Sequence, residues 1–147
     1  MPDAAHIREA AVIGAGTMGG GIVHVLALAG IDTVMLDAAE DVLSSARATI
    51  EKNLARQISK NRIDASDARA ALERIEPTTD YARIEGAGIV VEAVPESREL
   101  KRDVLTEVGG RVSDEAIVAT NTSSISITEL AAGLRRPERF VGMHFMN

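Results

Sequence analysis

The chain has 147 residues, of which 46% are hydrophobic and only 2% aromatic, so we expect one domain with an aliphatic core. A net charge of −6 and few aromatic rings argue against nucleic-acid binding, which needs a basic face and stacking side chains. The absence of cysteine excludes disulfides and thiol chemistry, and we expect no metal site. No apolar run is long enough to span a membrane, so we expect a cytoplasmic protein.

Segments with strand and helix periodicity alternate along the chain. Strands are expected at about residues 9–13, 32–36, 75–78, 88–93, 116–120 and 140–143. Helices are expected at about residues 17–29, 39–60, 65–73, 97–110 and 126–133. This alternation predicts an α/β fold of the Rossmann type, with a doubly wound, mostly parallel sheet.

Two helices carry more detailed expectations. The first has apolar residues at helical spacing, which predicts one buried face. The members of this face are Met18, Ile22, Val25, Leu26 and Ala29. The helix at 97–110 is expected to stop at Gly109 and Gly110, because glycine is a poor helix former.

A glycine-rich turn lies between the first strand and the first helix, in the pattern Gly-x-Gly-x-x-Gly. Gly14 allows the tight turn, Gly16 removes a side chain where backbone must approach a phosphate, and Gly19 lets the helix pack near the strand. Free N–H groups at the positive end of the helix dipole then favour a pyrophosphate. A purely structural turn is the alternative, and the flanking strand and helix favour the dinucleotide site.

Asp37 ends the second expected strand, about 20 residues after the glycine turn, where dinucleotide-binding folds place the acid that binds the adenosine ribose. Its carboxylate would repel a 2′-phosphate, and the following Ala38 and Ala39 supply no arginine. The sequence therefore favours NAD over NADP. An ordinary surface aspartate is the alternative.

The segment between residues 41 and 76 is longer than a normal crossover, so its two helices are expected to form a projecting arm. Lys52, Arg56 and Lys60 lie at i, i+4 and i+8 and share one face of the longer helix. This basic stripe is suited to a phosphate-bearing ligand. On the residues alone, an ordinary solvated helix face is the better interpretation.

Polar side chains follow the carboxyl ends of the expected strands, where ligands bind in open parallel sheets. They are Asp37, Glu96, residues 121–124 and His144. An imidazole takes up a proton near neutral pH, so His144 is the candidate base for the oxidation of an alcohol. The alternatives are helix caps for Asn121 and Ser123 and a structural role for His144.

These motifs together closely resemble the NAD-binding domain of the L-3-hydroxyacyl-CoA dehydrogenase family, and within it the bacterial 3-hydroxybutyryl-CoA dehydrogenases. The resemblance extends over nearly the whole chain and makes residues 1–147 one NAD-binding Rossmann domain. Its marks are GAGTMGGGI at 14–22, VVEAVPE at 90–96, ATNTSSISIT at 119–128 and RPERFVGMHFMN at 136–147.

The resemblance implies roles for the residues that match the family. The NAD-binding residues would be Gly14, Gly16, Thr17, Met18, Gly19, Asp37, Ala93, Glu96, Lys101, Asn121, Ser123 and Asn147. Substrate contacts would come from Asn53, Lys60, Asn121 and Ser123. The catalytic residues would be His144, as the base, and Ser123.

The implied reaction is the reversible oxidation of an L-3-hydroxyacyl-CoA, such as 3-hydroxybutyryl-CoA, with NAD as the oxidant, in fatty-acid or butanoate metabolism. Family members continue into a glutamate that orients the histidine and into an all-helical second domain with the homodimer interface. Neither is in this sequence, so we expect the chain by itself to bind NAD and to turn over slowly.

Two other functions stay open at this point. The first is a related NAD-dependent dehydrogenase of a free hydroxy acid, of the gulonate type, which would not need the basic stripe. The second is a non-catalytic module that binds NAD as a ligand.

Overall fold

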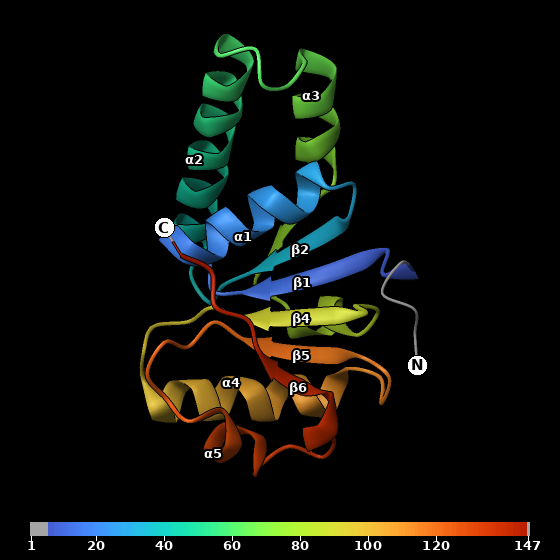
Figure 1. Cartoon of the computed structure of the whole chain (residues 1–147), viewed down its shortest axis with the longest axis vertical. Coiled ribbons are helices and arrows are strands. Elements are labelled where there is room, and N and C mark those ends of the chain that lie inside the picture. Colours follow the sequence, from blue (N-terminus) through green and yellow to red (C-terminus); the bar gives the residue numbers. More distant parts are fainter. Residues whose placement is uncertain (1–5, 147) are drawn as a thin grey trace.

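A six-stranded parallel sheet forms the centre of the computed structural model, which describes residues 6–146 (Figure 1). The strand order is β3-β2-β1-β4-β5-β6. The strands are β1 (Glu9–Ile13), β2 (Asp32–Leu36), β3 (Ile75–Thr78), β4 (Ile89–Glu92), β5 (Ile117–Thr120) and β6 (Phe140–Gly142). The direction of winding reverses between β1 and β4, which is where doubly wound sheets bind their ligands. The Rossmann prediction is therefore confirmed.

Helices cover both faces of the sheet. They are α1 (Thr17–Leu28), α2 (Glu40–Ser59), α3 (Ala65–Glu73), α4 (Arg98–Arg111) and α5 (Ile127–Ala131). Short 3₁₀ turns at Tyr81–Ile84 and Pro137–Arg139, which the sequence patterns did not predict, complete the connections. Within residues 6–146, no helix is both long and apolar enough to cross a membrane.

The four inner strands β1, β2, β4 and β5 are buried on both faces, and their alternate residues build two aliphatic cores. Val12 and Met35 belong to the core shared with α1, α2 and α3, whereas Ile13 and Leu36 belong to the core shared with α4. All four side chains are at most 2% exposed. This two-sided burial explains why the strands are nearly continuous apolar runs.

The arm predicted between residues 41 and 76 is present. Figure 1 shows α2 and α3 side by side, extending well beyond the sheet. α3 starts where the Asp64 N–H donates to the Asp67 carboxylate at 3.3 Å, which satisfies a free helix-end donor. The base of α2 packs on the sheet core through Leu43 and Ala46.

The predicted buried face of α1 is wrong in two positions. Val25 is 56% exposed and Ala29 is also exposed, whereas Val23 and Ala27 are fully buried. The helix is turned because it packs through its glycines: a Cβ on Gly20 would lie 3.8 Å from the Ala46 side chain of α2. The close packing of α1 at Gly20, and not the spacing of its apolar residues, thus decides which face of the helix is buried.

The predicted end of α4 is confirmed to within one residue, since the helix includes Gly109 and Gly110 and ends at Arg111. Val108 and Val112 on either side of the two glycines are buried in the core. Packing of these two valines therefore outweighs the poor helix propensity of glycine, which is about 1 kcal/mol per residue.

We predict that Gly19→Ala destabilises the domain by about 2–3 kcal/mol, because a Cβ there would overlap the carbonyl oxygen of Gly14. Gly110→Ala is the matched control, since a Cβ at this exposed helical position meets no atom within 4 Å. It should stabilise α4 slightly. Urea unfolding measures both changes, and equal effects of the two substitutions would contradict the packing role of Gly19.

Candidate functional site

A cleft of about 770 Å³ opens at the carboxyl edge of the sheet. It brings together residues that follow β1, β2, β4, β5 and β6, as expected for parallel strands whose carboxyl ends share one edge. Its lining includes Gly14, Gly16, Thr17, Met18, Asp37, Ala93, Glu96, Asn121, Ser123 and His144.

The glycine loop forms one wall of this cleft. Gly14 has φ +97°, and a Cβ at this residue would lie 2.6 Å from the Ala93 carbonyl oxygen, so only glycine fits. A Cβ on Gly16 would meet no atom within 4 Å, which leaves the backbone there open to a ligand. α1 begins at the next residue without a side-chain cap or an acid in its first turn. These features fit a bound pyrophosphate.

Asp37 connects the end of β2 to the glycine loop. Its Oδ2 accepts a hydrogen bond from the Ala15 N–H at 2.9 Å, and its Oδ1 accepts one from the Ala39 N–H at 3.1 Å. Each carboxylate oxygen has a second lone pair, and the side chain lines the cleft. The carboxylate is therefore held in place and can still accept hydrogen bonds from ribose hydroxyls.

Glu96 joins the loops that follow β4 and β5. Its carboxylate accepts hydrogen bonds from the Thr122 hydroxyl and from the Ser124 hydroxyl, the latter at 3.3 Å. Partial desolvation raises the pKa of the Glu96 carboxyl, but the Thr122 bond and the charge of Lys101 outweigh it, and the pKa lies below its usual value. Glu96 is therefore a negative charge at this rim.

Asn121 holds the segment that carries the histidine. Its Oδ1 accepts a hydrogen bond from the Phe145 N–H at 2.7 Å, and the Thr120 carbonyl accepts one from the Met143 N–H at 2.9 Å. The helix-cap alternative for Asn121 and Ser123 is wrong, because Ser126 caps α5. Thr120 and Asn121 thus hold the chain on the two sides of His144.

His144 and Ser123 are both exposed and line the same cleft. Within residues 6–146, the imidazole of His144 has no hydrogen-bond partner, so it is free to exchange a proton with a ligand. A hydroxyl and an imidazole that line one cleft are suited to polarising and deprotonating an alcohol.

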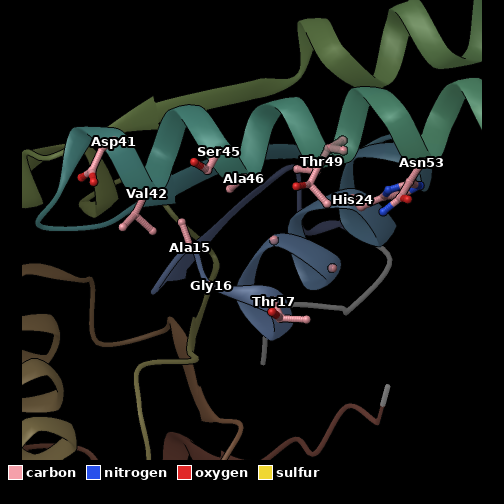
Figure 2. A pocket seen from close by; sticks show the side chains of 13 residues that line it. Ala15, Gly16, Thr17, His24, Asp41, Val42, Ser45, Ala46, Thr49 and Asn53 are labelled. Carbon is pink, nitrogen blue, oxygen red and sulfur yellow. The ribbon is translucent and has the colours of Figure 1, made fainter.

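A second cleft, of about 470 Å³, lies between α1 and α2 and adjoins the first, because both are lined by Gly16, Thr17 and Val42. Figure 2 shows His24 of α1 and Thr49 and Asn53 of α2 along it. Gly20 and Gly21 carry no side chains that would fill the space between α1 and α2, which leaves room for the cleft. The cleft thus continues the carboxyl-edge cleft towards the arm.

Residues 9–147 match the family of 3-hydroxyacyl-CoA dehydrogenase NAD-binding domains. The chain belongs to this family. The resemblance found in the motifs is therefore confirmed, and NAD is the cofactor that the family domain binds. Of the clefts described above, the one at the carboxyl edge has the glycine loop and the aspartate that suit NAD.

Relatives and solved structures agree with this assignment. The chain is 49% identical over 144 residues to a 3-hydroxybutyryl-CoA dehydrogenase of Bradyrhizobium diazoefficiens, covering 98% of this chain and 49% of that protein. The crystal structure of the (S)-3-hydroxybutyryl-CoA dehydrogenase of Ralstonia eutropha matches 96% of this chain and 50% of its own, with a TM-score of 0.93 and 42% identity. The fatty acid oxidation complex subunit alpha of Pseudomonas putida is 45% identical over 141 residues, which are 96% of this chain and 20% of that subunit. The chain thus spans about half the length of the two dehydrogenases.

Some residues that the family resemblance implied lie outside the carboxyl-edge cleft. Gly19 is buried beneath the glycine loop, and Lys101 is 1% exposed in the interior. Asn53 lines the cleft between α1 and α2, and Lys60 is exposed at the end of α2. Asn147 lies outside the described residues.

The sequence motifs did not identify His24 or Thr49 as site residues. The structure puts both in the cleft between α1 and α2, where His24 Nε2 lies 3.0 Å from Gln57 Oε1. The three consecutive glycines at 19–21 could have predicted this cleft. The dinucleotide motif needs only Gly19, whereas Gly20 and Gly21 leave one side of α1 without side chains.

We predict that Asp37→Asn weakens NADH binding about tenfold, the equivalent of one well-made hydrogen bond, and narrows the preference for NADH over NADPH. One oxygen of the carboxylate becomes a donor that faces a backbone N–H. Asp32→Asn at the exposed opposite end of β2 is the matched control. Fluorescence titrations give the affinities, and an unchanged NADH to NADPH ratio in Asp37→Asn would rule out this role.

Proposed function

We propose that the protein containing this domain is a NAD-dependent L-3-hydroxyacyl-CoA dehydrogenase of fatty-acid metabolism, acting on 3-hydroxybutyryl-CoA or a similar short acyl-CoA. The observation that carries this proposal is the presence of His144 and Ser123 in one cleft with the glycine loop. The names of the similar dehydrogenases supply the substrate class.

The cofactor is assigned to the carboxyl-edge cleft. Gly14, Gly16, Thr17 and Met18 would hold the pyrophosphate at the start of α1, with Gly19 beneath them, and Asp37 would bind the adenosine ribose. The loops with Ala93, Glu96, Asn121 and Ser123 would then border the nicotinamide half. NAD, when bound, supplies the acceptor for the hydride that leaves C3 of the hydroxyacyl group.

The role of the base that accepts the substrate's hydroxyl proton is assigned to His144. Its neutral imidazole would accept the hydroxyl proton of the substrate, and in the reverse direction the imidazolium would return this proton to the keto oxygen. The Ser123 hydroxyl would donate a hydrogen bond to the same oxygen and fix its position. The bond between Asn121 and Phe145 holds the His144 segment beside this point.

The CoA part of the substrate is assigned to the cleft between α1 and α2 and to the basic stripe. Asn53 lines the cleft, and Lys60 lies seven residues further on the same helix face, about 10 Å away. Lys52 and Arg56 are exposed on α2 as well. These three cations suit the phosphates of CoA, which a free hydroxy acid lacks.

Three further features are proposals for the whole protein. They are a second, helical domain outside this chain, assembly as a homodimer through that domain, and a cytoplasmic location. His144 and Ser123 are exposed in this domain, so the second domain would exclude water from the reacting atoms.

We predict that the 147-residue domain binds NADH in a saturable manner but turns over acetoacetyl-CoA slowly. The cofactor half of the site is built into the chain, whereas the open cleft leaves water around His144. NADH fluorescence titration and steady-state absorbance measure the two properties. Absence of any NADH response would overturn the proposed function, and full steady-state activity would overturn the need for a second domain.

We predict that Lys60→Glu weakens acetoacetyl-CoA binding to the NADH complex about five- to tenfold by placing like charge beside a CoA phosphate. NADH affinity should not change, because Lys60 lies outside the carboxyl-edge cleft. Arg69→Glu on α3 makes the same charge change at an exposed residue of the arm and serves as control. Equal weakening in both variants would favour a general charge effect and contradict the assignment of Lys60.

A further inference from the structure

A buried threonine lies between two residues of the proposed site. Thr122 follows Asn121 and precedes Ser123, and both of these neighbours line the carboxyl-edge cleft. Thr122 itself is only 7% exposed and does not line the cleft. Its side chain therefore has no direct contact with a ligand there, and its role lies in what it holds.

The Thr122 hydroxyl makes two hydrogen bonds, one as a donor and one as an acceptor. It donates to Glu96 Oε1 in the loop after β4, and it accepts a bond from the Ile125 N–H at 3.1 Å. A bond from a hydroxyl to an ionised carboxylate is about twice as strong as one between neutral groups. One hydroxyl thus closes the segment 122–125 after β5 and connects it to the loop after β4.

The Glu96 carboxylate also binds the residue on the other side of Ser123. The Ser124 hydroxyl donates to the same oxygen, Glu96 Oε1, at 3.3 Å. Ser124 is exposed, so water competes for its bond, whereas the Thr122 hydroxyl is partly shielded from water. Both residues that flank Ser123 are therefore held at one point, and Thr122 is the stronger of the two attachments.

The Ser123 side chain has no attachment of its own. It is exposed, and within residues 6–146 its hydroxyl has no hydrogen-bond partner. The position of this hydroxyl is therefore set by the backbone of residue 123 and by a single side-chain torsion. A free hydroxyl on a fixed backbone can bond a ligand without first breaking another bond, provided that its neighbours hold the backbone in place.

Closure of the segment 122–125 does not explain the bond between Thr122 and Glu96. A threonine closes such a segment by accepting a nearby backbone N–H, and the bond from Ile125 already does this. The bond to Glu96 joins residues that are 26 positions apart in the sequence. What it adds is the position of the whole segment, and hence of Ser123, relative to the loop after β4.

We propose that Thr122 is a positioning residue, which holds the Ser123 hydroxyl at the point where it meets the substrate oxygen and does not touch the ligand itself. This inference rests on the proposed function, from which it takes the role of Ser123. It deepens that function, because the family resemblance implied roles for Asn121 and Ser123 but none for Thr122.

The test is a double-mutant cycle between Thr122 and Ser123, measured as the dissociation constant of acetoacetyl-CoA at saturating NADH. Thr122→Val keeps the shape of the side chain and removes both hydroxyl bonds. We expect it to weaken acetoacetyl-CoA binding about fivefold, and Ser123→Ala to weaken it about tenfold, as for one lost hydrogen bond each. Combined with Ser123→Ala, Thr122→Val should weaken binding less than about twofold further, because the hydroxyl that it positions is already absent.

Three further variants serve as controls. Thr122→Ser retains the hydroxyl and should bind acetoacetyl-CoA within about twofold of the unchanged domain. Thr106→Val makes the same chemical change on α4, where the exposed hydroxyl donates to the Arg102 carbonyl at 2.8 Å, and should leave binding unchanged. If Thr122→Val does not fold, Glu96→Ala breaks the same bond from an exposed residue and should show the same dependence on Ser123.

The outcomes separate this inference from the proposed function. If the unchanged domain does not bind acetoacetyl-CoA, or if Ser123→Ala binds it equally well, the role of Ser123 and hence the proposed function fails. If Ser123→Ala weakens binding but Thr122→Val does not, the inference alone is overturned. Losses that add up in the double variant, or a Thr122→Ser domain as weak as Thr122→Val, would likewise overturn it. A loss that serine rescues and that disappears without the Ser123 hydroxyl supports it.

Discussion

The site depends on one close approach of backbone to backbone. Gly14, at the end of β1, lies against the Ala93 carbonyl that follows β4, and Gly19 of α1 lies against the Gly14 carbonyl. No side chain fits at either glycine, so the loop, the helix and the neighbouring strand meet in a way that only glycine permits. One cleft is consequently bordered by the start of α1, the Asp37 carboxylate and the loop after β4.

The aliphatic interior stabilises the fold, whereas the polar side chains at the carboxyl edge of the sheet position the loops around the cleft. Apolar side chains on both faces of the sheet supply most of the driving force for folding, whereas the polar groups at the carboxyl edge bind one another. Asp37 holds the glycine loop, Glu96 connects two loops, and Asn121 holds the segment of His144. These contacts restrict the loops and side chains that border the cleft, which lowers the entropic cost of binding a cofactor there.

Much of this arrangement could be predicted from the sequence because the signals are local. Periodicity located the strands, and parallel strands necessarily bring Asp37, Ser123 and His144 to one edge. The misassigned features depend on contacts between distant segments. The exposure of Val25 and Ala29 follows from how α1 packs on the sheet and on α2, and no spacing rule contains that information.

The central claim is that one cleft holds NAD with its nicotinamide beside His144. A crystal structure of the domain with NADH and acetoacetyl-CoA tests it most directly. The account predicts that the pyrophosphate lies on the first turn of α1, that the adenosine ribose bonds Asp37, and that the nicotinamide C4 and His144 flank the keto carbon of the ligand. A nicotinamide outside the wall formed by Ala93 and Val94, or a keto oxygen out of reach of His144, would contradict it.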